Sequence, residues 1–148
     1  MKIYVKSFEE LDIYELYEIL RIRVDVFVVE QACPYPEIDG IDKEAFHIFG
    51  KENGEIAAYA RIYKENGEVH LGRVIAKKRG QGLGMLILNE AIKAACEKYG
   101  NEKIHIEAQT YAKEFYAKAG FEQRSESFVM DGIEHIKMIL ESPCQAKE

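Results

Sequence analysis

Apolar and polar residues alternate along three short segments in the middle of the chain. AFHIFG, EIAAYARIY and EVHLGRVIA, at residues 45–50, 55–63 and 68–76, each read as a β-strand. The pentapeptide KENGE separates them twice, starting at residues 51 and 64, and Asn-Gly supplies the two residues that tight hairpin turns favour. The pattern therefore predicts an antiparallel three-stranded meander.

Helical spacing appears on both sides of this meander. Ser7 and Glu10 have the form of a capping box, which predicts a helix from there to about Arg23. Its predicted buried stripe is Leu11, Tyr14, Tyr17, Leu20 and Val24. VDVFVVEQ predicts a second short helix, and the proline-containing ACPYPEIDGIDKEA at residues 32–45 predicts a loop. After the meander, a third helix is predicted to end at Gly100 and to bury Met85, Leu88, Ile92, Ala95 and Tyr99.

The remaining segments complete a mixed α/β sheet. KIYVKSF near the start and KIHIEAQ at residues 103–109 read as strands, and YAKEFYAKAGF reads as a short helix that ends at Gly120. FEQRSESFVM and IEHIKMIL predict a closing hairpin around Asp131-Gly132. We expect a single domain over residues 1–141 and a short frayed tail over residues 142–148.

Composition narrows the class of protein. The chain has 148 residues, of which 47% are hydrophobic and 31% charged, and its net charge of −6 argues against broad nucleic-acid binding. No apolar run approaches the ~20 residues of a membrane span, and the first residues lack the apolar core of a signal peptide, so we expect a cytoplasmic protein. The three cysteines are odd in number and widely spaced, and we expect all of them to be reduced: Cys96 in the core, Cys144 in the tail, and Cys33 as a candidate reactive thiol.

The stretch KKRGQGLGM follows a strand and precedes a helix. It lacks the Lys-Ser or Lys-Thr of a Walker A loop and the spacing of a dinucleotide fingerprint. Glycines let the backbone approach a ligand closely, and the free N–H groups at a helix start suit a pyrophosphate. Lys77, Lys78 and Arg79 add positive charge. The alternative is a plain tight turn with solvated lysines.

RGQGLG resembles the Q/R-x-x-G-x-G/A signature of the GNAT superfamily of N-acetyltransferases, with Arg79, Gly82 and Gly84 in the signature positions. FYAKAGF resembles a second hallmark of that superfamily, with Tyr116 as its tyrosine, and the order of elements is also similar. LRIRVDVFVVEQACPYPEIDGID, AYARI, GRVI, AQTYAKEFYAKAGF and DGIEHIKM more narrowly resemble the ElaA-like branch. The resemblance covers nearly the whole chain.

The resemblance implies a GNAT acyl-CoA N-acyltransferase fold: a mostly antiparallel central sheet that splays between its fourth and fifth strands and is flanked by helices. It further implies that acetyl-CoA lies in the splay as the acyl donor, with no metal. The residues expected to bind it are Val74, Ile75, Ala76, Arg79, Gly80, Gln81, Gly82, Leu83, Gly84, Met85 and Phe115.

The implied reaction is direct acetyl transfer to a primary amine of a small molecule or peptide. Tyr116 would protonate the departing thiolate, because an unperturbed phenol is protonated at neutral pH. Glu68 and His70 are candidate bases, as are Glu107 and Glu30. Acceptor contacts are expected from Phe27, Glu30, Gln109 and His135. Glu30, Glu37, Asp39 and Asp42 read either as an acidic rim for a cationic amine or as a solvated loop.

One departure from the family pattern concerns the link before Arg79. Family members usually carry a proline and a longer link there, whereas this chain has only IAKKRG, about two residues shorter by that comparison. The position of the strand bulge is therefore left open. Two other functions also stay open: a degenerate module that binds CoA without turnover, and an acyltransferase of the acyl-homoserine-lactone-synthase type. Neither nucleic acid nor membrane is an expected partner. The family resemblance allows a homodimer.

Overall fold

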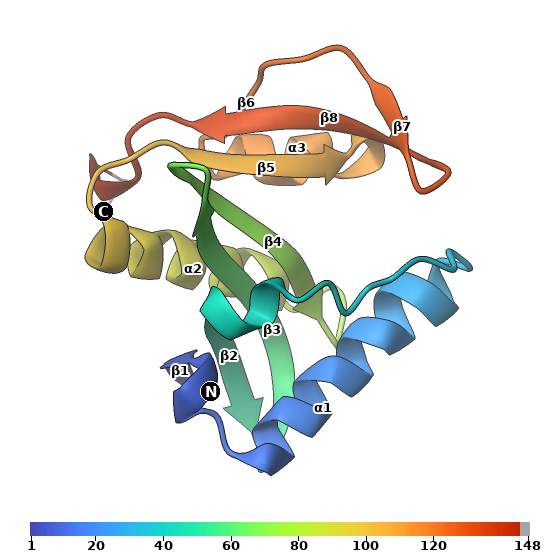
Figure 1. Ribbon diagram of the computed structural model, residues 1–148, viewed down its shortest axis with the longest axis vertical. Coiled ribbons are helices and arrows are strands. Elements are labelled where there is room, and N and C mark those ends of the chain that lie inside the picture. The colour runs from blue at the N-terminus through green and yellow to red at the C-terminus, as the bar shows by residue number, and fades with distance from the viewer. Residues whose placement is uncertain (146–148) are drawn as a thin grey trace.

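The computed structural model describes residues 1–145, which form one eight-stranded sheet flanked by helices (Figure 1). The strand order is β1-β2-β3-β4-β5-β8-β6, and β7 also pairs with β8. β4 and β5 are parallel, and the other strand pairs are antiparallel. The strands are β1 Lys2–Ser7, β2 Phe46–Glu52, β3 Glu55–Glu65, β4 Glu68–Ala76, β5 Ile104–Gln109, β6 Glu122–Gln123, β7 Phe128–Met130 and β8 Ile133–Leu140. The predicted mixed α/β architecture is confirmed.

The hairpin turns have the geometry that their sequences predict. Asn53-Gly54 and Asn66-Gly67 both have φ angles of +52° and +78°, so each pair lies in the left-handed region that type I′ turns require. Asp131 and Gly132 repeat the same two angles between β7 and β8. The meander of β2, β3 and β4 and the closing hairpin therefore form where the sequence predicts them.

The first helix begins later than its sequence suggests. The capping box of Ser7 and Glu10 forms, but it caps a single 3-10 turn at Phe8–Glu10. A second capping box, from Asp12 to Glu15, starts α1 at Ile13–Val24. Residues Asp25–Glu30 are not a separate helix, because they continue α1 as a π-helical turn.

The predicted buried stripe of α1 is wrong at its two tyrosines, and its other members, Leu11, Leu20 and Val24, are only half-buried. Tyr14 and Tyr17 are 80% and 73% exposed, whereas Glu15, Ile19, Ile22 and Arg23 form the buried face. The reason is that both charged residues on this face have oppositely charged partners: Lys6 and Lys51 bind Glu15, and the partners of Arg23 are described below. Polar residues therefore occupy core positions, and the apolar pattern indicates the wrong side of the helix.

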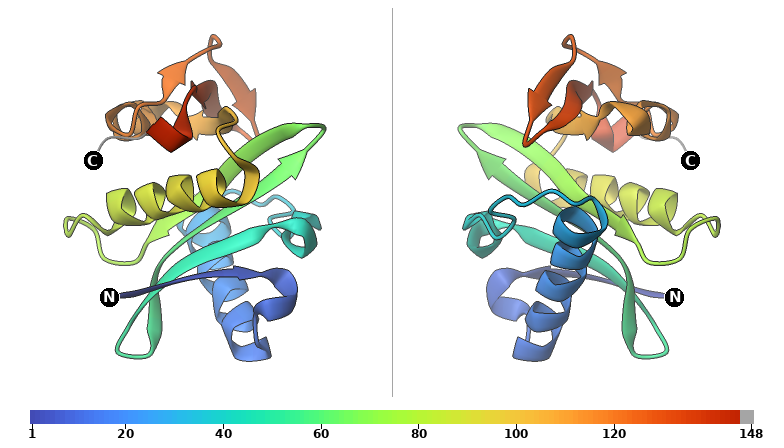
Figure 2. Two further views of the ribbon diagram at one scale, coloured as in Figure 1. Left: turned by 90° about the vertical axis from the view of Figure 1, so that its left-hand side faces the viewer. Right: turned by 90° about the vertical axis from the view of Figure 1, so that its right-hand side faces the viewer.

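Helices cover both faces of the β1–β4 half of the sheet (Figure 2). Ile19 and Ile22 of α1 pack on one face against Phe49, Tyr59 and Ile75. On the other face, α2 at Leu83–Tyr99 packs Ile87, Leu88, Ala91 and Ile92 into the larger core, which Phe121, next to α3 at Lys113–Lys118, also joins. Gly100 ends α2 with a φ of +83°, which confirms the predicted C-cap.

The sheet splays between β4 and β5. Among the described residues, these strands pair only at Val69 with Ile104 and at His70 with His105. Beyond that point the two strands diverge, and the remaining six residues of β4 have no partner on β5 (Figure 1). The splay that the family resemblance implies is therefore present, and it opens toward the end of β4.

A disulfide bond corrects the expectation that Cys96 and Cys144 are reduced. Cys96 lies near the end of α2, and Cys144 lies in a 3-10 turn at Pro143–Gln145. Their Cα atoms are 5.2 Å apart although 48 positions separate them in the sequence, so their spacing could not reveal the contact. Cys33 is free and buried. The end of the predicted tail, residues 146–148, lies outside the described residues.

Candidate active site

The splay between β4 and β5 opens into a cleft of about 1140 Å³. Its walls come from both strands, from the start of α2, from α3, and from the segment that follows α1. Of the residues predicted for donor binding, catalysis or acceptor contact, sixteen line it: Phe27, His70, Val74, Ile75, Ala76, Arg79, Gly80, Gly82, Leu83, Gly84, Met85, Glu107, Gln109, Phe115, Tyr116 and His135. Glu30, Glu68 and Gln81 do not line it.

Residues 79–84, here called the glycine turn, contain glycines in two different settings. Gly80 and Gly82 have φ angles of +79° and +73°, in the left-handed region that favours glycine. A Cβ atom at either position would meet nothing within 4 Å, so the space beside the turn is open. Gly84 lies in the first turn of α2, where a Cβ atom would lie 3.4 Å from the ring of Phe115.

The glycine turn leads directly into the amino end of α2. Gly82 is the residue before the helix, and no side chain caps the first N–H groups. Such groups, together with the helix dipole, attract an anion. Lys78 and Arg79 lie in the cleft lining beside them.

The strand bulge that the sequence left open lies at Arg73. Tyr59 pairs with Ile75 and Arg61 pairs with Gly72, so β4 has one extra residue opposite Ala60. Arg73 has a φ of +56°, which is unusual for a residue other than glycine. Arg73 and Val74 together lie opposite Ala60, so the bulge includes Val74 and immediately precedes Ile75 and Ala76.

Tyr116 lies on α3 beside Phe115 and Phe121, and both rings meet it edge to face. Burial raises the pKa of the Tyr116 phenol to about 12. The phenol is therefore protonated throughout the neutral range and can donate a hydrogen bond into the cleft.

Two histidines lie side by side where β4 and β5 still pair. The ring centroids of His70 and His105 are 5.6 Å apart, and the ring of Tyr63 stacks on His70 at 5.1 Å. The carboxylate of Glu68 lies 3.7 Å from Nε2 of His70 and 3.9 Å from Nε2 of His105. Burial, assisted by the neighbouring His105, lowers the pKa of His70, which favours a neutral imidazole at pH 7. His105 was not predicted as a site residue, because its strand pairing with His70 is visible only in the fold.

The loop carboxylates do not form an acidic rim. Glu37 and Asp42 are 3% and 5% exposed, and Arg23 donates hydrogen bonds to both at 2.8 and 2.6 Å. Arg61 binds Asp39 and Asp42 at 2.6 and 3.0 Å. The idea of a free acidic rim is therefore wrong, because arginines from α1 and β3 neutralise these carboxylates.

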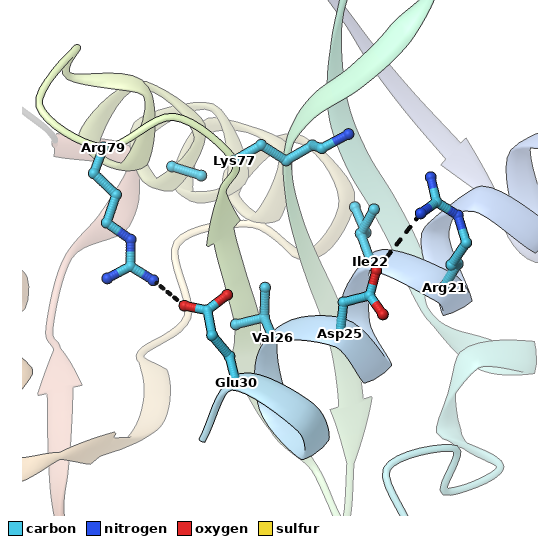
Figure 3. A pocket seen from close by; sticks show the side chains of 8 residues that line it. Arg21, Ile22, Asp25, Val26, Glu30, Lys77 and Arg79 are labelled. Atoms are coloured by element: carbon cyan, nitrogen blue, oxygen red, sulfur yellow. Dashed lines mark hydrogen bonds and ion pairs between the residues drawn. The ribbon is translucent and has the colours of Figure 1, made fainter. Parts of the chain in front are cut away.

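Glu30 lies outside the cleft lining, beside a second, smaller pocket of about 250 Å³ (Figure 3). Its carboxylate and Arg79 point toward each other and form an ion pair of 2.8 Å, while Arg21 and Asp25 form another along α1. Both members of the first pair are largely exposed. Glu30 therefore contacts the glycine turn.

The segment after the π-helical turn crosses from the β4 side to the β5 side of the cleft. The side chain of Gln109 donates to Gln31 at 3.1 Å, and Gln31 donates to the Tyr111 hydroxyl at 3.4 Å. The thiol of Cys33 donates to the backbone oxygen of Asp131 at 3.1 Å. These contacts fix Gln109, which lines the cleft, and they give the buried Cys33 a structural partner.

Within residues 1–145, no cluster of three or more His, Cys, Asp or Glu side chains is arranged to hold a metal ion. In the same residues, no helix is long and apolar enough to span a membrane.

Comparison with known proteins agrees with this geometry. Residues 17–142 match the family model described as an acetyltransferase (GNAT) domain. A UPF0039 protein of Schizosaccharomyces pombe is 38% identical over 141 residues, covering 92% of this chain and 94% of that protein. The crystal structure of Escherichia coli ElaA has a TM-score of 0.89 and 35% identity, covering 95% of this chain and 99% of that chain. An acyl-CoA N-acyltransferase from Pseudomonas aeruginosa also has a TM-score of 0.89, with 33% identity, covering 94% and 99%.

The cleft, the glycine turn and these matches define an acyltransferase: the chain belongs to the GNAT acetyltransferase family. Within that family it belongs to the ElaA-like branch, since ElaA of E. coli is 37% identical over 139 residues. A CoA-dependent acyl-homoserine lactone synthase, MesI, has a TM-score of 0.72 at 16% identity, covers 95% of this chain and 88% of that one, and shares the fold alone.

Proposed function

We propose that the chain transfers an acetyl group from acetyl-CoA directly to a primary amine of a small molecule or peptide. The observation that carries this proposal is that one cleft holds the open glycine turn, the unpaired part of β4 and Tyr116. The family membership supports an acyl-CoA donor, and the protonated phenol supports thiolate departure.

The donor binds along β4 and ends at the glycine turn. Backbone groups of Val74, Ile75 and Ala76, which have no partner on β5, hydrogen-bond the pantetheine arm as a further strand would. The diphosphate lies against the N–H groups at the start of α2, where Gly80 and Gly82 leave room for it. The loop residues in this role are Arg79, Gly80, Gln81, Gly82, Leu83, Gly84 and Met85, with Phe115 packed on Gly84.

Tyr116 supplies the proton for the leaving group. The amine nitrogen attacks the thioester carbonyl, the carbon–sulfur bond breaks, and the sulfur takes the phenolic proton. Since burial raises the pKa of Tyr116 to about 12, the phenol has its proton at every physiological pH. Solvent then returns a proton to the phenolate.

His70 is the proposed base on the acceptor side. A lysine-like amine has a pKa near 10.4, so holding it neutral at pH 7 costs about 4–5 kcal/mol. The neutral imidazole of His70 can accept the ammonium proton directly or through water, and Glu68 stabilises the resulting imidazolium. Phe27, Gln109 and His135 line the same cleft and are proposed to contact the acceptor.

The test is release of free CoA thiol when purified protein is mixed with acetyl-CoA and a panel of primary amines. Tyr116→Phe should lower kcat by about 10²–10⁴-fold, whereas calorimetry should show an unchanged affinity for acetyl-CoA. Tyr17→Phe is the matched control, because Tyr17 is exposed on α1 and should behave as the native protein does.

Two outcomes would contradict the proposal. Tight binding of acetyl-CoA without amine-dependent thiol release would indicate a CoA-binding module. No binding of acetyl-CoA at all would remove the basis of the donor site.

A further inference from the structure

Arg73 combines an unfavourable backbone conformation with a tightly held side chain. Its φ of +56° lies in the left-handed region, and it is the extra residue of the bulge in β4. The other residues with positive φ in the described chain, apart from glycines and Ala32, are Asn or Asp in hairpin turns. An arginine at such a position is maintained by what its side chain binds.

The guanidinium of Arg73 donates hydrogen bonds to two acidic residues and lies near two aromatic rings. Nε donates to the Glu37 carboxylate at 2.6 Å, and an NH2 group donates to the Glu37 backbone oxygen at 3.0 Å and to Asp39 at 3.3 Å. The rings of Phe27 and Tyr35 lie 5.8 and 5.6 Å from the guanidinium carbon. These contacts require the planar fork of arginine.

The partners of Arg73 are themselves fixed. Glu37 also accepts a hydrogen bond from the fully buried Arg23, and Asp39 is bound by the buried Arg61. Asp42 connects these two arginines, since each donates to its carboxylate. The bulge in β4 is thus tied through one side chain to a buried ionic network that joins α1, β3 and the loop over residues 37–42.

We propose that Arg73 is a positioning residue: its side chain holds the β4 bulge so that Val74, Ile75 and Ala76 present their backbone groups to the acyl donor. The same guanidinium contacts Phe27 and Tyr35, which line the cleft on its proposed acceptor side. Arg73 therefore positions both the strand that binds the donor and two side chains near the acceptor. The catalytic part of this inference rests on the function proposed above, whereas the positioning of the bulge does not.

Two substitutions distinguish the effect of the backbone conformation at residue 73 from the effect of its side-chain contacts. Glycine adopts a positive φ freely, so Arg73→Gly removes the hydrogen bonds and keeps the backbone conformation accessible. Arg73→Lys keeps the charge and removes the fork. Arg124→Gly is the control, because Arg124 forms exposed ion pairs and does not line the cleft.

We expect Arg73→Gly to lower kcat for acetyl transfer at least tenfold, to raise KM for acetyl-CoA less than kcat falls, and to regain turnover when ethylguanidine is added. Arg73→Lys should show an intermediate kcat with a melting temperature close to the native value. The control should match the native protein. A native kcat in a folded Arg73→Gly protein, or in Arg73→Lys if the glycine variant does not fold, would overturn the proposal.

Hydrogen exchange gives a readout that does not depend on turnover. Amides in residues 72–77 should exchange faster in Arg73→Gly or Arg73→Lys than in the native protein, and slower again with ethylguanidine in the glycine variant. Unchanged exchange would overturn the proposal even if no acceptor amine were found. Absence of turnover in the native protein, with faster exchange in the variants, would contradict the proposed function and leave the positioning role of Arg73 supported.

Discussion

Gly82 and Gly84 are two positions apart, yet they differ in backbone conformation and surroundings. Gly82 has a positive φ with open space around it, whereas Gly84 has helical geometry and lies against Phe115. A substitution to alanine therefore tests backbone strain at the first position and packing at the second.

The two alanine variants should differ in their affinity for CoA. Gly82→Ala forces an L-residue into the left-handed region, which costs roughly 1–2 kcal/mol. We expect the free turn to avoid this cost by changing conformation, so that CoA must restore the native turn and binds about 5–30-fold more weakly. Gly84→Ala places its methyl group at an ordinary contact distance of 3.4 Å from Phe115, so its affinity should stay close to the native value. Titration calorimetry with CoA measures both, and equal affinities for the two variants would contradict this account.

At the residue scale, the sequence could predict the donor side of the site better than the acceptor side. The glycine turn is local, so Arg79, Gly82 and Gly84 could be recognised from consecutive residues, and the structure places all three on the cleft. Arg73 and His105 could not be recognised, because one acts through a strand bulge and the other through pairing between strands far apart in the chain.

At the scale of elements, the face of α1 that meets the sheet depends on ionic partners from elsewhere. Lys6 and Lys51 bind Glu15, and Glu37 and Asp42 bind Arg23. A pattern of apolar residues cannot reveal such partners, so the predicted stripe of α1 was wrong. The hairpins were predicted correctly because their Asn-Gly and Asp-Gly turns determine their geometry within two residues.

Removing one member of the buried ionic network should destabilise the protein strongly. Glu37→Gln leaves the buried Arg23 without one of its charged partners, and breaking a buried pair in this way costs about 3–5 kcal/mol. Urea unfolding should show this loss, while Glu9→Gln, at an exposed position, should unfold as the native protein does. A loss below about 1 kcal/mol, typical of a surface pair, would show that the network is not rigidly buried.

The same network should make stability fall as pH falls. His47 is buried between the Tyr59 hydroxyl and the backbone oxygen of Asp42, at 2.6 and 3.0 Å, and burial lowers its pKa. The unfolded chain therefore takes up a proton below about pH 6.5 that the folded chain does not, which lowers the free energy of unfolding. His70, whose pKa is also lowered by burial and by His105, acts in the same direction.

A second loss should follow at lower pH. Although burial alone would raise the pKa of Asp39, hydrogen bonds and charge from Arg61 lower it to about 2, and Arg23 and Arg61 lower the pKa of Asp42 against the same effect of burial. Their stabilisation is complete above the unfolded pKa of about 4 and is lost as pH falls below it. Melting temperatures at neutral, mildly acidic and strongly acidic pH should decrease in these two steps. His47→Gln should reduce only the first step, and an unchanged first step would contradict the role of His47.

At the scale of the whole molecule, the two parts of the sheet are joined by the short parallel pairing of β4 with β5 and by the Cys96–Cys144 disulfide. The bond closes a loop of 48 residues, and Cys144 also donates its backbone N–H to Asn101 at 2.9 Å. The disulfide could not be predicted from the sequence, because it depends on how distant segments meet. The splay beyond the short pairing followed from the family resemblance alone, whereas the order of elements could be predicted from local patterns.

Reduction of this disulfide should lower the free energy of unfolding by about 2–4 kcal/mol, since the crosslink restricts the unfolded chain. Guanidinium unfolding with and without a reductant measures the difference. Cys96→Ser should unfold identically under both conditions, because Cys33 then has only Cys144 as a distant partner. Titration of three free thiols in the denatured, unreduced native protein would show that the bond does not form.

Three features lie at the same end of the splay between β4 and β5. They are the parallel pairing of these two strands, the pairing of β8 with Ile104, and the Cys96–Cys144 disulfide. A rotation of β5 and β8 about this end would have its largest amplitude at the opposite end of β4, near the glycine turn. A small change in angle at the pivot becomes a large change in width at the entrance. We therefore expect the stiffness of that pivot, which includes the proposed base His70, to influence how fast the proposed acyl-CoA donor enters and free CoA leaves.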